Sequence, residues 1–325
     1  MIRGTPLVAA KELGKVFVGR SGVIDRLRGI EPLTVPAVDG VDLELFEGET
    51  VGLVGESGCG KSTLGRTLVG LYPPTSGDIY LDGRKLGAER TLEERRSMQM
   101  IFQDPFASLN PRVSIEDMLK EILTFHNLVP KNRLNERCRE LMGLVGLPGN
   151  ALSSYPRQFS GGQRQRIGIA RALALQPKIL IADEAVSALD VSVQASIINL
   201  LMDLKRDLRL TMLFISHNIS IVRQVSDRIA VMYLGRIVEI GPLKEVFDNP
   251  THPYTRLLLN SVPKMTPGSV LSNIPSGELP TLQSHYESCR FLGRCPVAIN
   301  QCQSSDPQLI NIGKSTHQAA CLLVK

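Results

Sequence analysis

Short apolar runs and amphipathic segments alternate along the chain from about residue 39 to residue 240. Residues 39–46 alternate apolar and polar positions, which predicts a strand with one buried face. The runs 50–54, 179–182 and 212–215 are short and apolar, as are interior strands covered on both faces in a mostly parallel sheet. Because helix-like segments separate these strands, the pattern predicts an α/β fold.

Two parts of the chain depart from this alternation. Polar-rich helical patterns over residues 115–125 and 133–145 predict an inserted helical subdomain. After residue 250 the periodicity fades into sequence rich in Pro, Gly and Ser, which predicts an appended segment. We therefore expect a core, a helical subdomain and a C-terminal extension with these bounds: residues 1–103 together with 167–248, residues 104–166, and residues 249–325.

The composition limits the class of protein. Of 325 residues, 43% are hydrophobic and 21% are charged, and the net charge is +5. No apolar run approaches the ~20 residues that cross a bilayer, and the apolar stretch 6–10 is too short for a signal peptide. Dispersed charges, 5% aromatic residues and no Trp argue against a nucleic-acid partner. We expect a cytoplasmic protein that reaches a membrane only through a partner.

A glycine-rich stretch directly after the predicted strand 50–54 fits the phosphate-binding pattern G-x-x-x-x-G-K-[ST]. A helical pattern over residues 63–69 follows, which provides the strand–loop–helix context that this motif requires. Backbone N–H groups of such a loop bind phosphate oxygens, while Lys61 reaches the terminal phosphates and Ser62 holds Mg²⁺. The sequence predicts a nucleoside triphosphate site formed by Gly55, Glu56, Ser57, Gly58, Cys59, Gly60, Lys61, Ser62 and Thr63.

A second candidate element lies at the end of the apolar run 179–182, where Asp183 and Glu184 follow directly. In P-loop NTPases a strand-end Asp supports the Mg²⁺ shell, and a carboxylate beside it can polarise the attacking water. We assign Asp183 to the metal and Glu184 to the water. Without a P-loop upstream, the same pair would be interpreted as a solvated strand end.

A third motif precedes a helical pattern that is predicted to begin at residue 167. Ser160 and the backbone of Gly161 and Gly162 form a candidate anion-binding nest at a helix start, and Gln163 completes the sequence S-G-G-Q. This sequence resembles the signature motif of ABC-type ATPases. The resemblance implies an ABC-type α/β core that binds ATP and Mg²⁺, with a mostly parallel sheet and an antiparallel β portion.

Other elements of ABC-type ATPases follow in the order typical of that family. Gln103 resembles the Q-loop glutamine, which also contacts Mg²⁺, Asp190 resembles the D-loop aspartate, and His217 is similar to the switch histidine. Phe17 is the candidate adenine-stacking residue, although an arginine-containing insertion over residues 18–36 follows it. The resemblance implies that the catalytic residues are Lys61, Gln103, Glu184 and His217.

Longer segments resemble a subgroup, the ATPase subunits of oligopeptide, dipeptide and nickel importers. These segments are residues 103–112, 155–158, 185–190 and 249–255. The chain departs from the common ABC pattern at Ala185, Val186 and Asn218, none of which is a phosphate or metal ligand. We expect the ATP-hydrolysing subunit of a peptide importer. Transport of nickel or another small solute, and a soluble ABC ATPase outside transport, are the alternatives.

The resemblance also implies an assembly. A chain with the P-loop and the signature loop on different faces needs a second ABC ATPase subunit, identical or homologous, to close each ATP site. Two transmembrane permease subunits and, indirectly, a solute-binding protein complete such an importer and hold the chain at the cytoplasmic face of the membrane. Residues 104–112 are expected to line the groove for a permease helix, with Phe106 and Leu109 as apolar contacts or as core residues.

Six cysteines raise a separate question. Cys59 and Cys138 are expected to be small buried hydrophobic residues. The other four lie in the C-terminal extension: Cys289, Cys295, Cys302 and Cys321. Because disulfides are rare in the cytosol, these four thiols predict metal ligation. Four thiolates suit an iron–sulfur [4Fe–4S] cluster, which some members of the subgroup are thought to hold in this region, and zinc or unligated thiols are the alternatives.

Overall fold

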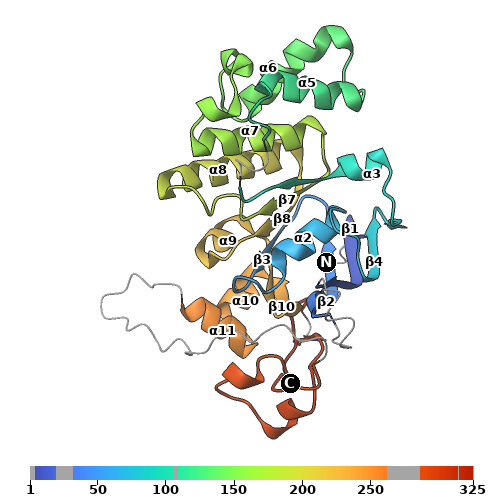
Figure 1. Cartoon of the computed structure of the whole chain (residues 1–325). Coiled ribbons are helices and arrows are strands. Elements are labelled where there is room, and N and C mark those ends of the chain that lie inside the picture. Colours follow the sequence, from blue (N-terminus) through green and yellow to red (C-terminus); the bar gives the residue numbers. More distant parts are fainter. Residues whose placement is uncertain (1–3, 20–31, 105–108, 262–285, 314, 325) are drawn as a thin grey trace.

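The computed structural model describes most of the chain, namely residues 4–19, 32–104, 109–261, 286–313 and 315–324. The candidate contact residue Phe106 and residues 20–31 of the arginine-containing insertion lie outside these ranges. Figure 1 shows two helices, α5 (Ile115–Phe125) and α6 (Leu134–Leu144), at one end of the molecule and the C-terminus at the other.

In the described part of the chain, the main sheet has eight strands in the order β11-β12-β10-β9-β3-β8-β7-β6. Neighbouring strands from β9 to β6 run parallel, and β10, β12 and β11 add antiparallel pairs at one edge. The bounds are β3 Thr50–Val54, β6 Met98–Ile101, β7 Ile179–Asp183, β8 Thr211–Ile215, β9 Arg228–Tyr233, β10 Arg236–Pro242, β11 Ile310–Asn311 and β12 Gln318–Ala319. The three apolar runs predicted as interior strands are β3, β7 and β8, so the mostly parallel sheet is confirmed.

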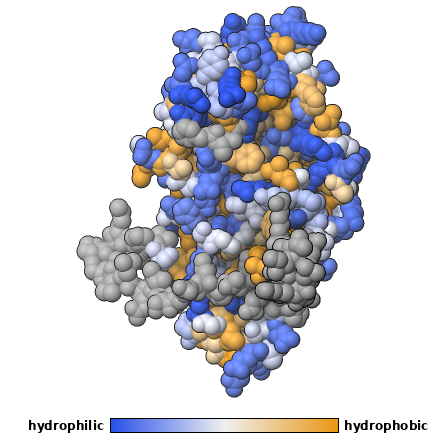
Figure 2. Space-filling view, in the orientation of Figure 1, coloured by the Kyte–Doolittle hydropathy of each residue, from blue (hydrophilic) through white to orange (hydrophobic). Residues whose placement is uncertain are grey.

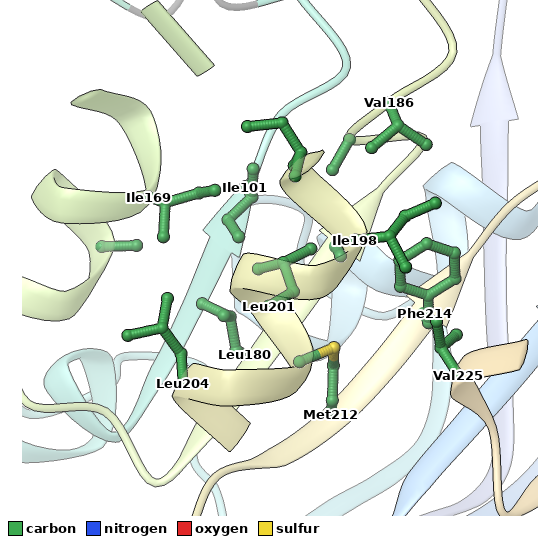
Figure 3. Packing of buried hydrophobic residues seen from close by; sticks show 14 of the residues in the cluster. Ile101, Ile169, Leu180, Val186, Ile198, Leu201, Leu204, Met212, Phe214 and Val225 are labelled. Carbon is green, nitrogen blue, oxygen red and sulfur yellow. The ribbon is translucent and has the colours of Figure 1, made fainter. Parts of the chain in front are cut away.

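The interior strands are apolar because both faces of the sheet are covered. On β8, Met212 and Phe214 belong to one hydrophobic cluster, while Leu213 and Ile215 belong to the other. Figure 3 shows the first cluster, in which Met212 and Phe214 lie beside side chains of α8 (Val191–Leu208). Full burial of such side chains contributes roughly 1.5–3 kcal/mol each. The sequence of a strand that is covered on both faces is therefore continuously apolar and does not alternate with polar residues.

A second, antiparallel sheet has the order β2-β1-β4-β5 in the described residues. Its strands are β1 Val8–Val18, β2 Thr34–Leu45, β4 Ser76–Leu81 and β5 Arg84–Lys85. The alternation over residues 39–46 corresponds to the second half of β2. The buried residues of that half, Val41, Leu43 and Leu45, join the cluster that contains Leu213 and Ile215 of the main sheet. The small sheet therefore packs on the face of the main sheet opposite α8.

The remaining helices are α2 Lys61–Leu68, α3 Leu92–Ser97, α7 Gly161–Ala174, α9 Ile219–Val225, α10 Leu243–Asp248 and α11 Pro253–Asn260, with 3₁₀ turns at Lys131–Arg133, Gly149–Ser153, Pro156–Gln158, Leu292–Arg294 and Asn300–Gln303. None of the helices in the described ranges has the length and apolar character needed to cross a membrane. On the face shown in Figure 2, polar residues predominate and hydrophobic residues occupy separate small areas.

Helix α7 begins at Gly161, where Ser160 caps it, as expected for a signature loop at a helix start. The helical pattern recognised in the sequence begins later, at residue 167. The backbone N–H of Gln163 donates to Ser160 Oγ at 3.3 Å, and the Ser160 N–H donates to Gln163 Oε1 at 2.9 Å. This reciprocal capping box satisfies two N–H groups at the helix start.

The chain beyond residue 249 is connected to the main sheet. Strand β12 pairs with β10, with Ala319 opposite Glu239. Tyr254 of α11 is fully buried in the main hydrophobic cluster. The sequence predicts an appended segment here but gives no sign of these contacts. The reason is that two-residue strands have no periodicity of their own and form only by pairing with distant residues.

Candidate functional site

The P-loop lies between β3 and α2 and surrounds the side chain of Lys61. The Lys61 Nζ donates to the carbonyl oxygens of Gly55 and Glu56, at 2.8 Å each, and the residue is 4% exposed. Gly60 has a φ of +110°, and a Cβ there would lie 2.0 Å from the carbonyl oxygen of Ala37. Only glycine fits at this position. The loop thus gathers an ammonium group and the N-terminus of α2, both of which attract phosphate.

Two groups at the far side of the P-loop form a candidate Mg²⁺ site. The Ser62 hydroxyl donates to Asp183 Oδ1 at 2.6 Å. The Asp183 side chain is fully buried, and its Oδ2 accepts no hydrogen bond from the described residues, although Arg66 Nη2 lies 3.7 Å away. Burial raises the pKa of Asp183, and the bond from Ser62 and the charge of Arg66 oppose that rise. A hydroxyl oxygen and a buried carboxylate oxygen without a donor are the ligand types that Mg²⁺ takes.

Glu184 stands at the centre of a polar triad. Gln103 Nε2 donates to Glu184 Oε2 at 3.1 Å, and His217 Nδ1 lies 3.4 Å from Glu184 Oε1. Glu184 has a φ of +46°, in the left-handed region that non-glycine residues rarely adopt. Such strain is concentrated at functional sites. The structure therefore brings together three of the residues that the sequence predicts to be catalytic.

The signature residues lie at the start of α7 and pack beside the D-loop. Ser160 and Gln163 form the capping box, and both side chains bond to backbone there. A Cβ at Gly161 would lie 3.5 Å from Leu189, and one at Gly162 would lie 2.5 Å from Val193. The signature loop is therefore in contact with the segment that contains Asp190. Asp190 occupies the N-cap position of α8, but its side chain makes no capping hydrogen bond there.

Two other predicted residues differ in their surroundings. The Phe17 ring is 37% exposed and contacts the Tyr72 ring edge-on, with centroids 5.3 Å apart, while Lys15 Nζ lies 5.3 Å from the Phe17 centroid. Its role in adenine stacking stays a prediction. Leu109 is 3% exposed and belongs to the main hydrophobic cluster, so of its two predicted roles the core role holds.

The predicted metal site in the C-terminal extension is not supported. Nowhere in the described ranges do three or more His, Cys, Asp or Glu side chains form a group that could hold a metal ion. Burial raises the pKa of Cys289 to about 11, a net shift to which the nearby Cys302, Cys295 and Cys321 also contribute. The described residues therefore support neither an iron–sulfur cluster nor a zinc site formed by these four cysteines.

The other two cysteines are buried, as predicted. Cys59 is 2% exposed and Cys138 is fully buried. Burial raises the pKa of both thiols, that of Cys138 to about 11. Both side chains therefore act as small hydrophobic groups.

Arg66 is a residue of the site that the sequence analysis missed. Its Nη2 lies 3.7 Å from Asp183 Oδ2. The sequence contained a signal for this role. Ser62 and Arg66 are four residues apart and therefore share one face of a helix, which places Arg66 beside the proposed Mg²⁺ ligand.

Two further residues contact the P-loop from the C-terminal part of the chain. The backbone N–H of Glu56 donates to Tyr254 Oη at 2.9 Å, across 198 residues of sequence. Arg294 donates to both carboxylate oxygens of Glu56, at 2.7 and 2.8 Å, across 238 residues. No sequence signal connects positions this far apart, so only the structure identifies these contacts.

Two family models match the chain. Residues 38–187 match the family model described as ABC transporter, and residues 238–302 match the model described as oligopeptide/dipeptide transporter, C-terminal region. The second match covers the contact residues Tyr254 and Arg294.

Similar proteins and structures agree with these models. The chain is 48% identical to the oligopeptide transport ATP-binding protein AppF of Bacillus subtilis over 98% of this chain and 97% of AppF. It is 47% identical to OppF of Escherichia coli over 90% of this chain and 89% of OppF. Among solved structures, the dimeric ATP-binding cassette MJ0796 bound to ADP and Pi has a TM-score of 0.62 and 28% identity over 73% of this chain and 98% of the cassette. The protein cbiO1 of Clostridium perfringens, described as part of the ABC transporter complex cbiONQ, has a TM-score of 0.61 and 27% identity over 75% of this chain and 91% of cbiO1. The chain belongs to the family of ABC transporter ATP-binding proteins.

Proposed function

We propose that the chain is the ATP-hydrolysing subunit of an importer that carries oligopeptides or dipeptides across the cytoplasmic membrane. The observation that carries the cargo class is the match of residues 238–302 to the C-terminal region of oligopeptide and dipeptide transporters. The relatives named as oligopeptide transport ATP-binding proteins support it, because the similarity extends over nearly the whole chain.

In this proposal Ser62, Asp183 and Gln103 hold Mg²⁺ beside the phosphates of ATP. When bound there, the metal would supply positive charge that offsets the charge of the phosphates. The P-loop binds the same phosphates through its N–H groups and through Lys61, whose Nζ is already directed into the loop. The charge of Arg66 opposes the rise in the pKa of Asp183 that burial causes.

Glu184 is the residue proposed to orient the attacking water. Its two carboxylate oxygens contact Gln103 and His217, which favours this orientation of the side chain. A carboxylate held in this way can accept the water proton as the bond to the γ-phosphate forms. His217 and Lys61 then stabilise the charge that develops on the phosphate oxygens.

We also propose that a second ABC ATPase subunit completes each ATP site. The helix start at Ser160 presents N–H groups and a positive dipole end, which suit the γ-phosphate of ATP bound to the partner subunit. The similar cassette MJ0796 is described as dimeric, with ADP and Pi bound. Binding of ATP between two subunits would drive closure, because the closed dimer has the higher affinity.

Two permease subunits are proposed to hold the pair at the cytoplasmic face of the membrane, with a solute-binding protein delivering the cargo. We propose that a short permease helix docks in a hollow of about 470 Å³ between the core and the helical part. Its lining combines three arginines, Arg90, Arg95 and Arg171, with apolar side chains that include Val69, Leu71, Met98, Met100, Phe102 and Ile122. Phe102 in this surface directly precedes Gln103 in the sequence, so a docked helix would affect the position of Gln103 and its hydrogen bond to Glu184.

Transport by the purified complex tests the proposed function. The complex is reconstituted in liposomes with ATP enclosed on the side of the ATPase subunits, and uptake of labelled oligopeptides, dipeptides and nickel is measured in parallel. We expect ATP-dependent uptake of peptides and none with a Glu184→Gln complex. Uptake of nickel but not of peptides would show that the cargo is nickel. ATP hydrolysis without uptake of peptides or nickel would refute the importer role.

A further inference from the structure

The C-terminal part of the chain holds Glu56 of the P-loop from two sides. Tyr254 Oη accepts the backbone N–H of Glu56, and the Arg294 guanidinium binds both oxygens of the Glu56 carboxylate. The carbonyl oxygen of the same residue accepts from Lys61. Glu56 is therefore connected both to the phosphate-binding lysine and to residues beyond position 250.

The ion pair is largely buried and lies beside two aromatic rings. The side chains of Arg294 and Glu56 are 10% and 21% exposed. The Arg294 guanidinium lies 5.9 Å from the Tyr233 ring centroid and 6.0 Å from that of Phe291. Glu56 raises the pKa of Arg294, which stays charged at all relevant pH values. A two-point pair in partly buried, aromatic surroundings is stronger and more rigid than a typical surface pair.

The segment that carries Arg294 is anchored independently of the P-loop. Arg290 donates to the Leu234 carbonyl at 2.6 Å and pairs with Asp39 and Asp306. Phe291 packs on Tyr233 with centroids 5.4 Å apart. Because these contacts tie the segment to the core, Arg294 reaches Glu56 from a fixed position and can determine where the carboxylate lies.

The charge of Glu56 gives this contact a consequence for nucleotide binding. Glu56 lies within a loop that binds a polyanion, so its free carboxylate would repel the phosphates. Burial of the pair limits screening by salt. We propose that Arg294 is a positioning residue of the ATP site, which neutralises and orients Glu56 so that the C-terminal segment sets the affinity of the P-loop for Mg·ATP. This inference rests on the proposed ATPase function.

Nucleotide titration of the full-length chain tests the inference. Arg294→Ala is expected to raise the dissociation constant of a fluorescent Mg·ATP analogue about tenfold, which corresponds to about 1.4 kcal/mol. In the purified complex, KM for ATP should rise more than kcat falls. Arg137→Ala is the matched control, because it also removes an arginine–glutamate pair, at 2.8 Å from Glu140, but on α6. It should bind the analogue like the wild type.

The double variant Arg294→Ala with Glu56→Gln separates charge compensation from structural support. If Arg294 acts by neutralising Glu56, the added substitution restores affinity to within about threefold of wild type. Wild-type affinity in Arg294→Ala would overturn the inference. So would a loss that follows the melting temperature and is not restored by Glu56→Gln. Failure of the wild-type chain itself to bind Mg·ATP would instead refute the proposed function.

Discussion

Replacement of Glu184 by Gln removes one negative charge and almost no volume. In the structure, Glu184 Oε2 accepts from Gln103 and Oε1 faces His217. A glutamine can retain one of these contacts through its carbonyl oxygen, and its amide can bond to a neutral imidazole nitrogen. Neither contact involves Lys61 or Ser62, so the phosphate-binding part of the site should be unaffected.

The expected magnitude follows from the role of the carboxylate. A positioned general base typically contributes about 10²- to 10⁴-fold to a rate, which corresponds to roughly 2.7–5.4 kcal/mol in the activation free energy. The amide of glutamine cannot accept the proton of water. We therefore expect kcat for ATP hydrolysis to fall by at least about 10²-fold, while the affinity for Mg·ATP changes little and the ATP-bound dimer becomes longer-lived.

Phosphate release by the purified complex measures this effect, with nucleotide titration of the same samples. Glu140→Gln, an equivalent change on the surface of α6, is the control and should hydrolyse ATP at the wild-type rate. If Glu184→Gln retains hydrolysis within about threefold of wild type, Glu184 does not orient the water. If the variant instead loses affinity for Mg·ATP, its main role would be structural.

Three further predictions address other parts of the molecule. Lys61→Ala should weaken binding of Mg·ATP itself, since two loop carbonyls and the phosphates lose their ammonium group, and normal affinity in a titration would contradict this. Ser160→Arg should abolish hydrolysis in the purified complex while the isolated subunit still binds Mg·ATP, since bulk and charge would occupy the partner's phosphate position; normal turnover by the complex would exclude a composite site. Burial lowers the pKa of His252 to about 4, despite the opposing charge of Glu239, so the neutral ring is favoured in the folded state. Stability from this group is complete above about pH 6.5 and is lost as the pH falls toward 4, by up to about 3 kcal/mol. Chemical denaturation should show a smaller loss over that range in His252→Asn, and an equal loss would refute the assignment.

Motifs formed by neighbouring residues were predictable from the sequence. The P-loop, the strand-end pair of Asp183 and Glu184, and the signature residues each occupy a short stretch with a recognisable pattern. The apolar runs of β3, β7 and β8 were also identified, because burial on both faces leaves a continuous apolar signal. Ser160 was placed at a helix start as a phosphate contact, whereas its role as the cap of α7 was recognised only in the structure.

The number and spacing of the C-terminal cysteines were not enough to predict a metal site. Four thiols within a short, Pro-containing stretch predicted metal ligation, yet the structure forms no metal-binding group from them. The spacing of the cysteines gives the number of possible ligands but not the directions in which their side chains point. Those directions depend on how Cys289 and its neighbours pack in three dimensions, which the local sequence does not show.

The sequence by itself determined the family, the phosphate-binding loop and the residues proposed for chemistry, because each depends on residues adjacent along the chain. Only the tertiary structure decided that Glu184 meets Gln103 and His217, and that Tyr254 and Arg294 hold Glu56. These contacts join segments separated by up to 238 residues. No periodicity records them, because they exist only after the strands of the main sheet have paired and the C-terminal segment has packed against that sheet.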